Sequence, residues 1–163
     1  MHLSTVDSRA ADKAANYRQL QAEVAAILEG ERDFIANSAN CAALLFQSLP
    51  DLNWAGFYYL KGADLVLGPF QGKPACVRIG PGRGVCGAAA ARREALIVPN
   101  VHKFAGHIAC DSESNSEIVV PLLNDDRLLG VLDLDSPLLN RFDEIDAQSL
   151  QSIAAMLLAA SDC

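Results

Sequence analysis

The chain has 163 residues, 51% of them hydrophobic and 6% aromatic, which is enough for one domain with its own core. Its 13 Lys and Arg against 20 Asp and Glu give a net charge of −7, and no basic run carries interleaved aromatic residues, so we expect no nucleic-acid partner. Residues 1–19 lack the apolar segment of a signal peptide or a membrane span, so we expect a cytoplasmic protein without a membrane partner.

The first part of the chain predicts two helices. Residues 8–29 place apolar side chains at helical spacing, and Gly30 is a suitable stop. Residues 31–48 place a second apolar stripe, which includes Ile35 and Cys41. Cys41 is therefore expected in the core.

Short β-rich runs follow, interrupted by one helix. The predicted strands, in chain order, are "NWAGFYYL", "LVLGPF", "ACVRI", "ALIVPNV", "EIVVPLL" and "LLGVLDLDS". The turns "KGAD" and "NDDR" predict two hairpins, and "GVCGAAAARRE" predicts the helix. A last helix is expected at residues 143–160.

This order predicts an α+β fold, with a mainly antiparallel central sheet of about six strands flanked by helices. We expect a single domain over residues 1–163, with N-terminal helices at 8–48, the sheet and its functional loops at 51–136, and the C-terminal helix at 143–160. Residues 102–116 show no periodic pattern, and loops of that length in compact domains are usually functional or disordered.

The glycine-rich "GRGVCG", residues 82–87, formally matches a dinucleotide-binding pattern. We discount that interpretation because "VPNVHKFAG" lacks the acidic residue that such a site needs about twenty positions on. A glycine turn entering a helix fits better. Near that helix N-terminus, Cys86 is either a thiol activated by backbone N–H groups or a small packed residue.

Two further cysteines have polar neighbours. Cys76 lies beside Lys73 and Arg78, whose charges would lower the pKa of its thiol, although a buried strand residue is the simpler interpretation. Cys110 lies in the polar segment "GHIACDSESNSE", where acidic neighbours raise the pKa of its thiol and only His107 could lower it. Its expected exposure is the unusual feature, since free cysteine is commonly buried.

A zinc site built from loop residues is the alternative for several of these side chains. Its ligands would come from Cys76, Cys86, His102, His107 and Cys110. Structural zinc sites usually bring ligands in close pairs, whereas the nearest of these cysteines are ten residues apart. We therefore expect no metal, and expect both histidines to be loop residues that hydrogen-bond the backbone.

Three acidic residues lie in the last predicted hairpin. Asp133 and Asp135 alternate with leucines and share one face of their strand, and Glu117 opens the partner strand. If the numbers of paired residues add to an even sum, as when 117 lies opposite 133, all three acids lie on one face of the sheet. An odd sum places Glu117 on the opposite face. The sequence does not fix this register. The acids form either a solvated face or a pocket for an ammonium group in which one acid can donate a proton.

At these residues the chain resembles the free methionine-(R)-sulfoxide reductases, single-domain enzymes built on the GAF fold. The similar segments are "NWAGFYYL", "LVLGPFQGKPACVRI", "GRGVCG", "VHKFAGHIACDSESNSEIVVPL", "GVLDLDS" and "RFDEID", which cover residues 50–147 in the family's order. Binding-only GAF domains lack this set of three cysteines. The resemblance therefore implies a GAF-like domain and a reductase.

The resemblance implies that Cys110 is the nucleophile, that Cys76 resolves it, and that Cys86 can act as a second resolving residue. The Cys110 thiolate would attack the sulfoxide sulfur while a protonated Glu117 or Asp135 gives a proton to the oxygen. The resulting sulfenic acid would then form a Cys76–Cys110 disulfide, which thioredoxin reduces.

The resemblance also assigns the pocket. Glu117, Asp133 and Asp135 match the substrate-binding acids, and Trp54 and Tyr58 match the pocket aromatics. Such acids would hold the ammonium group of a free amino acid, which a peptide-bound methionine lacks. The two aromatic side chains would supply an apolar wall, although they could equally be ordinary core residues.

The expected partners are thus free methionine sulfoxide and thioredoxin, without a cofactor, in a response to oxidative stress. The family also suggests a homodimer. Cys41 and Cys163 lie outside the family pattern and are expected to be incidental. The alternative is a non-catalytic GAF module that binds a small ligand or senses redox state.

Overall fold

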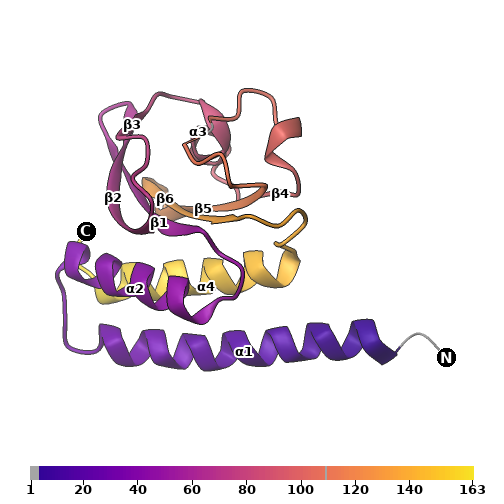
Figure 1. The fold of residues 1–163 in the computed structure, drawn as a ribbon. Coiled ribbons are helices and arrows are strands. Elements are labelled where there is room, and N and C mark those ends of the chain that lie inside the picture. The colour runs from indigo at the N-terminus through magenta and orange to yellow at the C-terminus, as the bar shows by residue number, and fades with distance from the viewer. Residues whose placement is uncertain (1–3, 109) are drawn as a thin grey trace.

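A six-stranded antiparallel sheet lies between helices in the computed structural model, which describes residues 4–108 and 110–163. Figure 1 shows α2 (Phe34–Ser48) and α4 (Glu144–Ala160) against one face of the sheet, with α1 (Ser4–Leu28) outside them. The helix α3 (Gly84–Arg92) and several loops cover the opposite face. The predicted α+β class and antiparallel sheet are therefore confirmed.

The helices follow the predicted pattern, although α1 begins at Ser4 rather than residue 8 and α3 ends at Arg92 rather than residue 94. α2 begins at Phe34 rather than residue 31, because the side chain of Asp33 caps it by accepting a hydrogen bond from the Ala36 N–H at 2.8 Å. Cys41 is fully buried, as predicted, but Ile35 is 54% exposed, so its place on the buried stripe was wrong. Within the described part of the chain, no helix is both long and apolar enough to span a membrane.

The strand order in the sheet is β3-β2-β1-β6-β5-β4. The strands are β1 (Trp54–Lys61), β2 (Asp64–Gly72), β3 (Arg78–Ile79), β4 (Leu96–Val98), β5 (Ser116–Asn124) and β6 (Arg127–Ser136). Both predicted hairpins form, as β1–β2 and β5–β6. β3 is shorter than predicted, because the chain before Arg78 lies outside the sheet, toward the loop between β4 and β5.

Side chains of the central strands alternate between the two faces of the sheet. On β1, Phe57 and Tyr59 pack toward α2 and α4, whereas Trp54 and Tyr58 belong to a second cluster under α3. β5 and β6 alternate in the same way, so the main core lies on the α2–α4 face. The other face is left for a smaller core and a pocket.

One buried carboxyl group ties α1 to α4. Asp146 has no exposed surface and accepts a hydrogen bond from the Tyr17 hydroxyl at 2.6 Å. It also forms ion pairs with Lys13 and with Arg141, the latter at 3.3 Å. Its second oxygen accepts from the backbone N–H of Asp143, which completes the capping box of α4. Several partners therefore depend on one side chain.

We predict that Asp146→Ala lowers the free energy of unfolding by about 3 kcal/mol, because it leaves Lys13 and Arg141 without their buried partner. The matched control is Asp162→Ala, which removes an ion pair with Arg32 that is exposed on both sides. This control should cost less than about 1 kcal/mol. Urea denaturation of both variants measures the difference, and equal losses would contradict the account.

Candidate active site

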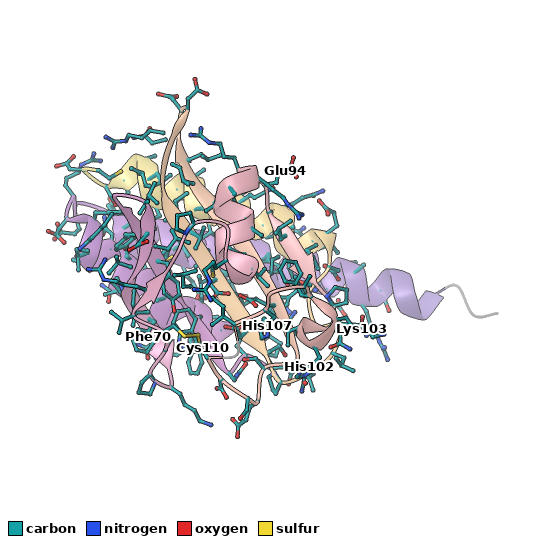
Figure 2. The ribbon with its side chains drawn as sticks, turned by 90° about the horizontal axis from the view of Figure 1, so that it is seen from above. Phe70, Glu94, His102, Lys103, His107 and Cys110 are labelled. Carbon is teal, nitrogen blue, oxygen red and sulfur yellow. A yellow bond between two sulfur atoms is a disulfide. The ribbon has the colours of Figure 1, made fainter. Side chains whose placement is uncertain are left out.

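A pocket opens on the α3 face of the sheet and encloses about 550 Å³ of space between protein atoms, counting the solvent at its mouth. The sequence-predicted residues in its lining are Trp54, Tyr58, Cys86, Cys110, Glu117, Asp133 and Asp135. Cys76 reaches it through a disulfide to Cys110. The structure thus brings all eight predicted site residues together. Figure 2 looks down on this face and shows Cys110 and His107 above the strands.

The pairing of β5 with β6 places the three acids on one face. Glu117 lies opposite Asp135, and Asp133 lies two residues along the same strand. The numbers of these paired residues add to 252, which is an even sum, with Asp135 rather than Asp133 as the partner of Glu117. Near the turn, the numbers of paired residues add to 251. An irregularity between Leu122 and Leu123 changes this sum to 252 for the rest of the hairpin. Without this β-bulge, Glu117 would point to the main core.

Burial dominates the electrostatics of these acids. Glu117 and Asp133 are each only 6% exposed. Burial raises the pKa of Asp133 to about 6, and burial together with neighbouring carboxylates raises the pKa of Glu117 and of Asp135 well above the usual range. Asp133 is therefore the acid most readily ionised, and Glu117 and Asp135 keep their protons to higher pH than ordinary carboxyl groups.

Of the two interpretations of Cys86, the small packed residue agrees with the structure and the activated thiol does not. Cys86 lies in the first turn of α3, but it is buried and its Sγ lies 3.9 Å from the Glu117 Oε1. Burial, followed by the charges of Asp133 and Glu117, raises the pKa of the Cys86 thiol well above its usual range. The helix N-terminus does not outweigh these effects, so Cys86 is a protonated thiol in this state.

A disulfide joins Cys76 to Cys110, with Cα atoms 5.8 Å apart. It links the segment between β2 and β3 to the long loop between β4 and β5. Cys110 is exposed, as predicted, and Cys76 is partly buried. Cys41, Cys86 and Cys163 are free. The cationic neighbours of Cys76 are engaged elsewhere, since Lys73 pairs with Glu113 at 2.9 Å and Arg78 with Asp64 at 3.7 Å.

Polar contacts that the sequence did not reveal hold the Cys110 loop. The Asn53 side-chain amide donates to Asp111 Oδ2 at 3.1 Å and to Ser114 Oγ at 2.9 Å. Asp111 also accepts from the Glu113 backbone N–H at 2.9 Å. Asp111 was expected only to raise the pKa of the Cys110 thiol, but its hydrogen bonds also stabilise the conformation of the loop. In the sequence, the signal for these contacts is Asn53, a polar residue directly before the aromatic strand.

The two histidines have different surroundings. His102 Nε2 lies 2.8 Å from the Asn115 side-chain oxygen, at the edge of the loop. His107 lines the pocket, and its Nε2 lies 3.7 Å from Glu117 Oε2. Burial lowers the pKa of His107. The expectation that both histidines hydrogen-bond the backbone was therefore wrong for their side chains. His107, expected as a loop residue near Cys110, is also a pocket residue.

The aromatic residues form one wall of the pocket. Trp54 stacks on Phe70 with ring centroids 5.3 Å apart, and its indole N–H donates to the Lys73 carbonyl at 3.1 Å. The Tyr58 hydroxyl donates to the Cys76 carbonyl at 2.9 Å. Both rings thus present apolar surface to the pocket while their polar atoms hold the segment that carries Cys76.

The chain matches a known domain and known enzymes. A family model for the GAF domain matches residues 14–160. Protein YtsP of Bacillus subtilis is 53% identical over 154 residues, which cover 93% of this chain and 94% of that protein. Free methionine-R-sulfoxide reductase of Escherichia coli is 51% identical over 154 residues, covering 93% of each.

A solved structure extends the likeness to three dimensions. The X-ray structure of free methionine-R-sulfoxide reductase from Neisseria meningitidis in complex with its substrate has a TM-score of 0.88 and 46% identity. It covers 91% of this chain, and this chain covers 89% of it. With both sequence and fold shared over nearly its full length, the chain belongs to the GAF-domain family of free methionine-R-sulfoxide reductases.

Proposed function

We propose that the protein reduces free L-methionine (R)-sulfoxide to methionine by thiol chemistry. The observation that carries the proposal is the Cys76–Cys110 disulfide beside a pocket lined by three carboxyl groups, two of which are buried. A disulfide in that position is the oxidised product expected of a reductase, and the acids suit a substrate that carries an ammonium group. The two named reductases described above support the same reaction.

In the proposed reaction, the reduced Cys110 thiolate attacks the sulfoxide sulfur and Glu117 donates a proton to the departing oxygen. Glu117 is favoured as the donor because burial and its acidic neighbours keep it protonated, and because it directly follows the loop that carries Cys110. The sulfoxide is reduced to methionine while Cys110 is oxidised to a sulfenic acid. The sulfoxide oxygen ends on the Cys110 sulfur, and the proton that Cys110 lost on forming the thiolate returns Glu117 to its protonated form, which balances the step.

Cys76 then attacks the sulfenic sulfur, which forms the disulfide and releases water. A thioredoxin-type dithiol attacks this disulfide, passes through a mixed disulfide, and returns both cysteines to thiols as it is itself oxidised. The exposure of Cys110 supports access by such a protein. Cys86 is buried, so it serves as a resolving thiol only if α3 or the loop moves.

Asp133 is the proposed partner of the substrate ammonium group. One of its oxygens, Oδ1, is buried without a hydrogen-bond partner, which an ammonium group would supply. Asp135 lies on the same strand face and opposite both Glu117 and Trp54. A bound ammonium group would lower the pKa of these acids, whereas a neutral amide would leave Asp133 unpaired.

We predict that the wild-type protein reduces the (R) epimer of free methionine sulfoxide and leaves the (S) epimer unchanged, in an assay coupled to thioredoxin. Cys110→Ser should lower kcat by at least about three orders of magnitude, because it removes the nucleophile. Cys163→Ser, which removes an exposed free cysteine, is the matched control and should keep full activity. Activity retained by Cys110→Ser would refute the proposal.

The second prediction concerns the oxidised product. One equivalent of substrate added to the fully reduced protein should yield the Cys76–Cys110 disulfide, detected by peptide mass spectrometry. In Cys76→Ser the reaction should stop at the Cys110 sulfenic acid, which a dimedone probe traps. Cys41→Ala should behave as wild type, since Cys41 is buried in the main core. A non-catalytic ligand-binding module would form neither species in response to the sulfoxide.

The third prediction is a pH dependence of methionine binding. The pKa of Asp133 is raised to about 6, so the carboxylate that attracts the ammonium group is formed above that pH and lost below it. Affinity should therefore rise roughly tenfold between about pH 5 and about pH 7, as measured by calorimetry. Asp133→Asn should bind weakly with a flat profile, while Asp64→Asn, which changes an acid outside the pocket, should keep the wild-type profile. A flat wild-type profile would contradict the role of Asp133.

A further inference from the structure

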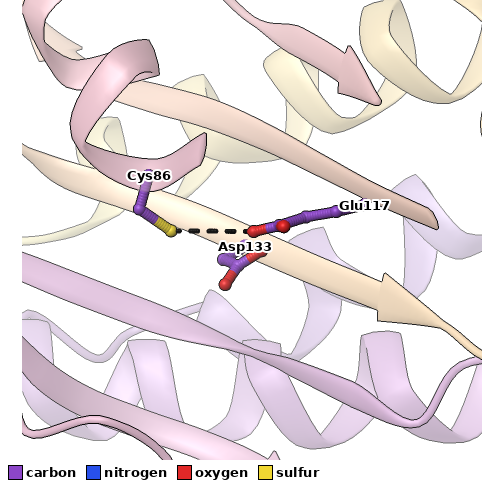
Figure 3. A group of neighbouring side chains, drawn as sticks. All are labelled: Cys86, Glu117 and Asp133. Atoms are coloured by element: carbon purple, nitrogen blue, oxygen red, sulfur yellow. Dashed lines mark hydrogen bonds between the residues drawn. The ribbon is translucent and has the colours of Figure 1, made fainter. Parts of the chain in front are cut away.

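Cys86, Glu117 and Asp133 form a compact group of possible metal ligands on the floor of the pocket. Figure 3 shows that they come from α3, β5 and β6 and point toward one another. One ligand atom from each, a sulfur and two carboxylate oxygens, lies within 4.8 Å of the other two. The zinc site rejected in the sequence analysis combined Cys86 with other cysteines and histidines, whereas this group combines it with two acids that the register of the hairpin places on one face.

The geometry of the group is close to that of a bound ion. Zinc binds thiolate sulfur at about 2.3 Å and carboxylate oxygen at about 2.0–2.2 Å, so tetrahedral neighbours lie about 3.5 Å apart. The Cys86 Sγ and Glu117 Oε1 are already 3.9 Å apart. Small side-chain rotations, without movement of the strands, would bring the three atoms onto one ion.

An unpaired oxygen independently indicates a missing cation. Asp133 is 6% exposed, and its Oδ1 is buried without a hydrogen-bond partner. Among residues 4–108 and 110–163, no Lys or Arg forms an ion pair with Glu117 or Asp133, and the neighbour of Glu117 is His107 at 3.7 Å. Buried carboxyl groups without a cation are costly, so the group is suited to accept one.

The ligand set survives oxidation of the protein. The disulfide consumes Cys76 and Cys110, but Cys86 remains a free thiol beside the two acids. A mixed sulfur and oxygen site favours borderline ions such as zinc and cobalt over magnesium and calcium, which prefer oxygen ligands alone. The same group is therefore available in the reduced and the disulfide states.

We propose that Cys86, Glu117 and Asp133 bind a thiophilic divalent cation of the zinc class, which competes with the substrate ammonium group and inhibits the enzyme. On binding, the Cys86 thiol and the protonated Glu117 release their protons to solvent as the metal–sulfur and metal–oxygen bonds form, and water completes the coordination. The cation is an inhibitor, not a cofactor. Binding of the cation is independent of turnover, whereas its competition with the ammonium group rests on the proposed function.

The test uses Co²⁺ as a spectroscopic probe of the full chain with its Cys76–Cys110 disulfide intact. A Cys163→Ser background removes the exposed free thiol. We expect one Co²⁺ per chain, a thiolate-to-cobalt charge-transfer band in the near ultraviolet, and loss of the band when Zn²⁺ is added. Cys86→Ser should abolish the band, and Asp133→Asn should raise the apparent Kd at least about tenfold. Cys41→Ala is the matched cysteine control and should retain the band.

Absence of the band in the parent protein, a band that survives Cys86→Ser, or an unchanged Kd in Asp133→Asn would overturn the site. Circular dichroism of each variant identifies misfolding, and the two ligand variants test the site separately. Competition is tested with L-methionine against glycine, which chelates free Co²⁺ through the same groups but has no side chain for the pocket. If methionine displaces more Co²⁺ from the protein than glycine does, the result supports competition. Equal displacement by the two amino acids refutes competition but not the cation site.

Discussion

The close approach of three carboxyl groups on one buried sheet face is the constraint on which the site depends. Carboxylates in such surroundings repel one another and lose their hydration, so burial and mutual repulsion raise their pKa values. The result is a group that keeps its protons to higher pH than ordinary carboxyl groups and is suited to receive a cation. The proposed proton donation and the proposed recognition of an ammonium group both follow from this one arrangement.

The fold supplies the arrangement by separating two tasks on the two faces of the sheet. The α2–α4 face carries the main hydrophobic core, which provides most of the burial. The α3 face carries a smaller core, the acids and the aromatic wall of the pocket. The cysteines lie on segments outside the sheet, and contacts such as Tyr58 with the Cys76 carbonyl connect these segments to it. The acids thus lie on strands of the sheet, whereas Cys76 and Cys110 lie on loops that side-chain hydrogen bonds connect to it.

Much of the fold could be predicted because hydrophobic periodicity and turn residues are local signals. Both hairpins, the four helices of the described chain, and the burial of Cys41 follow from such patterns. The register of β5 and β6 could not be predicted, since it depends on a β-bulge that changes the sum of paired residue numbers between the turn and the site. Gly130, beside this bulge, is the local hint, because glycine within a strand commonly marks such an irregularity.

The site could be predicted only in part. Resemblance to the family named the three cysteines, the acids and the aromatic residues, and the structure brings them to one pocket. The surroundings of Cys86 and His107 could not be read from the sequence, because both depend on contacts with Glu117 from a distant strand. A helix N-terminus suggested a reactive Cys86 thiol, but burial beside carboxylates had the larger effect on its pKa.

The central claim is that the buried acids select a free amino acid through its ammonium group. The most direct measurement compares kcat/KM for free L-methionine (R)-sulfoxide with that for its N-acetyl derivative, in wild type and in Asp133→Asn. The account predicts a wild-type preference of at least about 100-fold for the free amino acid, because the amide leaves a buried acid unpaired, and a much smaller preference in the variant. Equal kcat/KM for the two substrates in the wild type, or an unchanged preference in Asp133→Asn, would contradict it.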